Sequence, residues 1–165
     1  MRLHLLRHAK SSWDDPRLDD HSRPLAPRGV KAGRQLATWI GDHGPHPTLV
    51  LCSTATRARE TLELVLPALG DPDVSFEDGL YHASAGALLE RVRALEGEPD
   101  DVMVVGHNPG LQDVALLLSV RSPDRERIAT KLPTGALVTL ETTTPWALVA
   151  PGSARIVELV LPREL

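Results

Sequence analysis

Short apolar runs alternate with longer polar and amphipathic segments along the first 120 residues of the chain. Three of these runs, residues 3–6, 48–52 and 101–105, are predominantly apolar and end at polar residues, which is typical of buried strands. A shorter run at residues 74–76 indicates a further strand. Because helical segments follow these strands in turn, the pattern predicts a largely parallel sheet with helices on both faces.

Four segments carry the signals of helices. A helix of about sixteen residues is expected from Pro27, since proline is favoured in the first turn. Residues 53–66 form a second candidate, for which Thr54 supplies an N-cap. Residues 84–95 and 109–118 have apolar side chains at helical spacing and are the third and fourth predicted helices.

The remaining segments predict a loop and the edge of the sheet. Residues 10–27 are polar, contain three prolines and predict a long loop. The β-rich runs 136–141, 146–150 and 155–161 are joined by turns and predict an antiparallel margin. No repeat or linker divides the chain, so residues 1–165 predict a single domain: a three-layer α/β/α sandwich with a mainly parallel sheet.

Composition narrows the class of protein. The chain is 42% hydrophobic and 24% charged, as is ordinary for a globular domain. A net charge of −4, scattered arginines and few aromatic residues argue against a nucleic-acid partner. Cys52 has no second cysteine to pair with, and no apolar stretch approaches the roughly 20 residues that span a bilayer. Arg7 and His8 also interrupt the first apolar run, so we expect a soluble cytoplasmic protein without a membrane partner.

Polar side chains follow the three main predicted strands at the points where they end. Arg7 and His8 follow the first strand, residues 53–59 the second, and residues 106–108 the third. In a parallel sheet these ends share one edge, and ligands bind in the crevice outside it. The arrangement therefore predicts an active site in which two histidines meet.

The residue types at this edge suit phosphate chemistry. With Thr54 as the N-cap, Arg57 falls in the first turn of its helix, where the helix terminus favours an anion. Arg7, Arg57 and a protonated His107 can donate hydrogen bonds to three phosphoryl oxygens. A neutral His8 is then the candidate nucleophile, because an imidazole nitrogen attacks well when an acceptor holds the other nitrogen.

These motifs resemble those of the histidine phosphatase superfamily, which has the phosphoglycerate-mutase-like fold. The positions that carry the resemblance are Arg7 and His8 after the first strand, Ser53, Arg57, Ala58 and Thr61 at the second, and Gly106 and His107 after the third. The run Arg-His-Ala-Lys followed by Ser-Ser-Trp-Asp, the segment 20–25 and the short length look most like SixA-type phosphohistidine phosphatases. Ala9 stands where the mutases have glycine.

The resemblance implies a role for each matched residue. It implies that His8 is transiently phosphorylated, that Arg7, Arg57 and His107 bind the phosphate, and that no metal or other cofactor is needed. Larger relatives carry a Glu three residues before a Tyr, and here that spacing gives Asp78 before Tyr81. Asp78 is thus the candidate general acid, and its alternative role is that of a solvated turn residue.

Other polar residues are weaker candidates. Ser11, in the long loop, and Asn108, directly after His107, are candidate substrate contacts beside the phosphate site. Lys10, Asp14 and His21 share that loop and either select substrate or are simply solvated. The other histidines lack the spacing of metal ligands and are interpreted as structural residues: His4, His43, His46 and His82.

The sequence thus predicts a metal-independent phosphatase that works through a phosphohistidine intermediate on His8. The favoured substrate is phosphohistidine on a partner protein, because the chain is too short for the insertions that enclose small molecules in larger relatives. Two alternatives stay open: a phosphatase acting on a small metabolite, such as a sugar phosphate or phosphoglycerate, and a phosphate-binding module without turnover.

Overall fold

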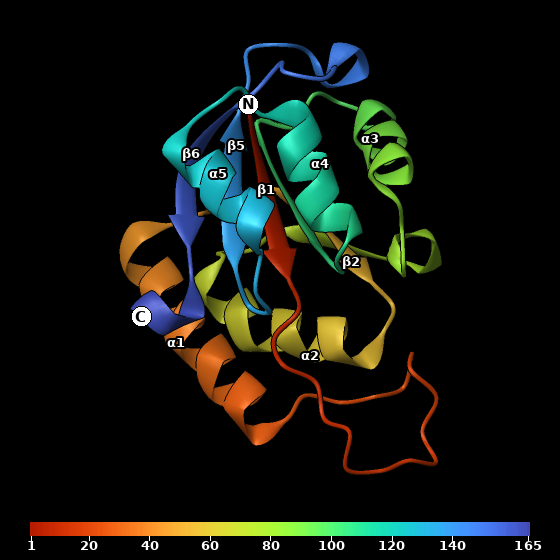
Figure 1. Ribbon diagram of the computed structural model, residues 1–165. Helices are drawn as coiled ribbons and strands as arrows, with labels where there is room; N and C mark the ends of the chain where they lie inside the picture. The colour runs from red at the N-terminus through yellow and green to blue at the C-terminus, as the bar shows by residue number, and fades with distance from the viewer.

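The computed structural model describes residues 1–165 and has the expected α/β architecture (Figure 1). The strands are β1 (Arg2–Arg7), β2 (Leu49–Ser53), β3 (Asp73–Glu77), β4 (Asp101–Gly106), β5 (Leu137–Glu141) and β6 (Arg155–Val160). The α-helices are α1 (Pro27–His43), α2 (Thr56–Val65), α3 (Ala85–Arg93), α4 (Gly110–Leu118) and α5 (Pro123–Thr130). None of these helices is long and apolar enough to cross a membrane.

A single six-stranded sheet runs through the molecule in the order β3-β2-β4-β1-β5-β6. Parallel pairing joins β3 to β2, β2 to β4 and β4 to β1, whereas β5 is antiparallel to both β1 and β6. The mainly parallel sheet with an antiparallel margin is confirmed. Since β2, β4 and β1 are direct neighbours, their carboxyl ends lie side by side, which is the condition for a shared site.

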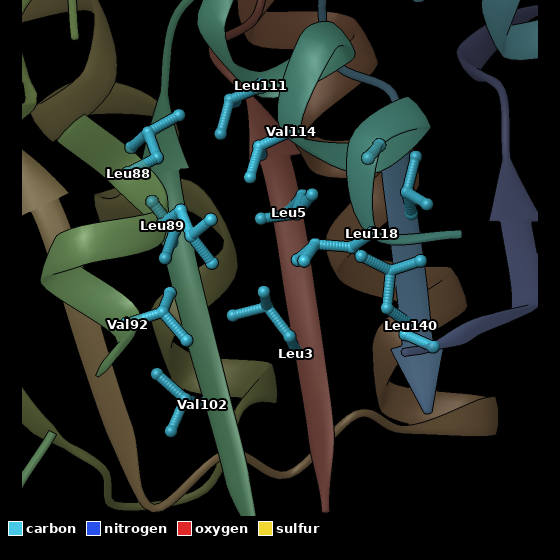
Figure 2. Close-up of a cluster of buried hydrophobic side chains, with 14 of the residues drawn as sticks. Leu3, Leu5, Leu88, Leu89, Val92, Val102, Leu111, Val114, Leu118 and Leu140 are labelled. Carbon is cyan, nitrogen blue, oxygen red and sulfur yellow. The ribbon is translucent and has the colours of Figure 1, made fainter. Parts of the chain in front are cut away.

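Two apolar cores lie on opposite faces of the sheet because side chains along each strand alternate between the faces. On β1, Leu3 and Leu5 belong to the larger core, which α3 and α4 cover (Figure 2). Leu6 belongs to the smaller core, together with Leu36 of α1 and Leu62 of α2. The helices therefore form layers on both faces, and the rigid sheet between them fixes the strand ends.

Two local expectations were wrong. Helix α2 begins at Thr56, and its N-cap position is Ala55, because the Thr54 hydroxyl is bonded to Asp78 instead. Residues 146–150 contain a short 3-10 helix and not a strand, because β5 pairs directly with β6 and the Trp146 indole is buried against the Pro99 carbonyl.

Helix α5 was not expected, because it has almost no apolar stripe; Ile128 is its one buried residue. Its signals were local. Ser122 caps it by accepting a hydrogen bond from the Arg125 amide, Pro123 occupies the first turn, and Asp124 adds a favourable negative charge there.

Candidate active site

The two histidines of the predicted site meet at the carboxyl edge of the sheet. Arg7 ends β1 and is paired in register with Gly106, the last residue of β4, so His8 and His107 leave neighbouring strands side by side. Their ring centroids are 5.1 Å apart, and both side chains are buried. Ser53 at the end of β2 completes the edge by bonding to His107. The structure thus brings together the strand ends that the sequence singled out.

Local hydrogen bonds hold the His8 ring in one tautomer. Its Nδ1 lies 2.7 Å from the Ala9 carbonyl oxygen, which can only accept, so Nδ1 carries the proton. The lone pair is therefore on Nε2, toward which the Arg57 Nε–H donates at 3.3 Å. Burial, with Arg57 and Arg7 nearby, lowers the pKa of His8 to about 4. At neutral pH the ring is uncharged, the state in which an imidazole can attack phosphorus.

Arg57 is positioned by a carboxylate that the sequence reasoning did not single out as a site residue. Its guanidinium donates to the Asp20 carbonyl at 2.6 Å and to the Asp20 carboxylate at 3.0 Å. The same carboxylate accepts from the Tyr81 hydroxyl at 2.6 Å and from Arg23 at 2.9 Å. The Tyr81 hydrogen bond, together with those of the two arginines, holds the pKa of Asp20 well below its usual range. Asp20 therefore stays ionised and holds both guanidinium groups in place by hydrogen bonds.

Burial favours a neutral His107 ring in this structure, whereas the protonated ring expected from the sequence belongs to the phosphate-bound state and remains a prediction. Burial, together with the nearby His8 and Arg57, lowers the pKa of His107 to about 3. Its Nε2 lies 2.7 Å from the Ser53 hydroxyl, whereas its buried Nδ1 has no hydrogen-bond partner. A bound phosphate dianion would raise this pKa by Coulomb attraction. Protonation of His107 is thus expected to accompany phosphate binding and not to precede it.

Arg7 and Asn108 share one anchor. The Arg7 guanidinium donates to the Leu132 carbonyl at 2.7 Å, and the Asn108 side-chain amide donates to the same oxygen at 3.1 Å. The Arg7 Nε is buried without a partner, so it is free to bind an anion. Ser11 accepts a hydrogen bond from Arg23 at 2.9 Å. In this structure Ser11 and Asn108 hold neighbouring groups, and substrate contact by either remains a prediction.

Asp78 lies at the margin of the site. Its carboxylate is exposed and accepts a hydrogen bond from the Thr54 hydroxyl at 2.6 Å, and it makes no hydrogen bond to His8, Arg57 or His107. The general-acid role of Asp78 therefore remains a prediction.

Two aromatic residues that follow Asp78 reach further into the site. Tyr81 bonds to Asp20, and its ring lies edge-on to His107 at 5.4 Å. The His82 ring stacks on Tyr81 at 4.0 Å, and its Nε2 lies 3.4 Å from the Asp20 carboxylate. The sequence reasoning assigned His82 a merely structural role. Its positive φ of 53° has no signal in the sequence.

Comparison with known proteins agrees with this geometry. The model of the histidine phosphatase superfamily (branch 1) matches residues 3–103, a span that includes Arg7, His8 and Arg57. The chain belongs to the histidine phosphatase superfamily. Among curated relatives, an uncharacterized protein of Mycobacterium tuberculosis is 37% identical over 162 residues, covering 96% of this chain and 100% of the relative. One of Mycobacterium leprae is 35% identical over 166 residues, with the same coverage.

Solved structures of the superfamily share the whole fold. A candidate phosphohistidine phosphatase SixA from Agrobacterium tumefaciens matches with a TM-score of 0.84 and 28% identity, covering 98% of this chain and 97% of that one. Its counterpart from Nakamurella multipartitia has a TM-score of 0.82 and 30% identity, covering 98% and 95%. As a SixA-type member of the histidine phosphatase superfamily, this chain is a phosphatase.

The depressed pKa of His8 predicts the acid limb of the pH profile. Because the folded-state pKa is lowered to about 4 from the ordinary 6.5, the neutral, nucleophilic ring persists well below pH 6.5. We expect kcat/KM, corrected for the titration of the substrate phosphate, to fall only as the pH approaches about 4. Steady-state kinetics with a chromogenic phosphate ester checks this. An enzyme inflection near pH 6.5 would contradict the buried, neutral state of His8.

Proposed function

We propose that this phosphatase removes phosphate from phosphohistidine on a partner protein, through a phosphohistidine intermediate on His8. One observation carries the proposal. The only carboxylate bonded to the predicted catalytic residues is Asp20, and its contacts with Tyr81 and the arginines keep it ionised. An ionised carboxylate cannot donate the proton that an alkoxide leaving group requires. Phosphohistidine instead expels an imidazole, and the departure of this leaving group depends far less on a positioned acid.

The proposed reaction has two steps. The lone pair on His8 Nε2 attacks phosphorus, the phosphorus–nitrogen bond of the substrate breaks, and the released imidazole takes a proton from solvent or a weak donor. Water then attacks the phosphoryl group on His8 and yields inorganic phosphate and the free enzyme. Arg7 and Arg57 stabilise the charge on the phosphoryl oxygens in both steps, which is the main requirement of phosphoryl transfer. The SixA likeness at 28% and 30% identity also supports a phosphohistidine substrate.

The proposed substrate class is tested by direct competition. We expect kcat/KM for a phosphohistidine protein or peptide to exceed that for sugar phosphates and phosphoglycerate by on the order of 10² or more, since monoesters depend on a positioned acid far more than phosphohistidine does. Phosphate release is measured for each substrate at one pH. A higher kcat/KM for a metabolite monoester would reverse the assignment in favour of a small-molecule phosphatase. Turnover of no substrate would indicate a binding module.

Asp78→Asn separates the two leaving groups within one enzyme. If Asp78 serves as an acid for monoesters, the variant should lose about 10- to 100-fold on unactivated monoesters, the lower end of the range for general acid catalysis. It should keep most of its activity on phosphohistidine. Asp73→Asn, an exposed carboxylate at the opposite end of β3, is the matched control. An equal large loss on both substrates would show that Asp78 is required for either reaction.

A further inference from the structure

A second, strongly basic pocket opens beside the phosphate site. It has a volume of about 600 Å³ and shares Arg7 with the site. Its other cationic side chains come from separate parts of the chain: Lys10, Arg28, Lys131 and Arg163. No acidic residue lines it. In a chain whose net charge is −4, five cations around one cavity are a local concentration that the overall composition does not explain.

The pocket is built on the backbone that carries His8. The Ala26 amide donates to the Lys10 carbonyl at 2.8 Å, and a β-carbon at Gly29 would lie 2.1 Å from that oxygen, so α1 packs directly on residue 10. On the other side, the Gly135 amide donates to the carbonyls of Arg7 and His8, both at 3.0 Å. The C-terminal turn lies beside α1 (Figure 1). The walls therefore stand at a fixed place relative to the nucleophile.

Four of the five cations of this pocket lack carboxylate partners. Lys10, Arg28 and Lys131 form no salt bridge. The one carboxylate near Arg163 is Glu164, at 4.0 Å, which bonds more closely to Arg127 at 2.5 Å. Like charges that converge without counterions repel one another, so an anionic ligand is stabilised there. Arg7, which lines the pocket and belongs to the predicted phosphate site, has a buried Nε without a hydrogen-bond partner.

We propose that this basic pocket binds acidic side chains that flank the phosphohistidine on the partner protein. The inference rests on the proposed function and deepens it by naming what the partner presents. Arg28, Lys131 and Arg163 are exposed and extend from three separate elements, so their charges are spread around the mouth of the pocket. A spread of flexible cations matches carboxylates distributed over a protein surface better than one compact phosphate, which convergent bidentate donors bind best.

The test compares two phosphohistidine peptides of equal length, one with acidic and one with neutral flanking residues. The wild-type enzyme should favour the acidic peptide in kcat/KM by roughly tenfold, mainly through KM, and the preference should shrink at high salt. The double variant Arg28→Ala/Lys131→Ala should lose most of this preference. The control Lys31→Ala/Arg34→Ala removes two exposed cations of α1 that do not line the pocket, and it should keep the preference.

The outcomes separate the inference from the proposed function. Equal hydrolysis of both peptides by the wild type, or an equal loss in the control variant, overturns the pocket assignment and leaves phosphohistidine hydrolysis standing. Hydrolysis of a chromogenic monoester but of neither peptide overturns both. A third substrate, a small bisphosphate, tests whether the pocket binds a second phosphate group of a metabolite instead. If the pocket variant lowers kcat/KM for the bisphosphate and neither peptide is preferred, the pocket binds a phosphorylated metabolite and not acidic residues of a partner protein.

Discussion

His8→Ala is expected to abolish both turnover and phosphorylation of the enzyme. The Nδ1 of His8 donates a hydrogen bond to the Ala9 carbonyl, so the lone pair of the ring is on Nε2. This Nε2 faces Arg57. Removing a nucleophile of this kind costs several orders of magnitude in kcat, roughly 10³ or more. Brief exposure of the wild type to labelled substrate, followed by a rapid quench, should leave one acid-labile, base-stable phosphate per active chain. The variant should carry none.

The control for this experiment is His43→Ala. His43 is exposed near the end of α1, where its ring stacks on Trp39, and it lies beside Arg2, at the opposite end of β1 from His8. That variant should be labelled like the wild type. Label that persists in His8→Ala would assign the phosphoenzyme to another residue, with His107 as the nearest candidate at 5.1 Å between ring centroids. Acid-stable label would point to a hydroxyl nucleophile instead.

The site residues that could be predicted from the sequence are those that directly follow the strands of the sheet. His8 and His107 each follow an apolar run, and parallel strands bring such positions to one edge whatever the details of the helices. Arg57 was placed correctly near the start of its helix even though the expected N-cap, Thr54, bonds to Asp78 instead. A one-residue error in the N-cap position left Arg57 in the first turn of the helix.

The part that could not be predicted depends on how the long loop folds back. Asp20 contacts Arg57 across 37 residues and Tyr81 across 61, and no periodicity records such contacts. One isolated antiparallel β-bridge, between Ser11 and Leu25, joins the two ends of the loop. The proline-rich sequence of the loop contains no signal for this pairing. The lowered pKa of His107 also has no signal in the sequence, because it results from burial and from neighbouring cations that only the folded chain assembles.

Arg57→Ala is expected to lower kcat/KM by about 10²- to 10³-fold, equivalent to about 2–4 kcal/mol, the range for losing one preorganised donor to developing charge. Most of the loss should appear in kcat, because the guanidinium is fixed by Asp20 before substrate binds and its interaction strengthens as charge builds on the phosphoryl oxygens. Arg57→Lys should recover little, since an ammonium cannot donate to both His8 and Asp20 in the same geometry.

Arg59→Ala is the matched control, because Arg59 lies two residues further along α2, is exposed, and stacks over Phe76 outside the site. It should retain nearly full activity. Treatment of the wild type with EDTA should also leave kcat/KM unchanged, because Arg7 and Arg57 are proposed to supply the positive charge that a metal ion supplies in other phosphatases. The proposed site would be wrong if chelation stopped turnover and Mg²⁺ or Zn²⁺ restored it, or if Arg57→Ala cost no more than Arg59→Ala. Either result would mean that the charge opposing the phosphoryl oxygens comes from a group other than the buried guanidinium beside His8.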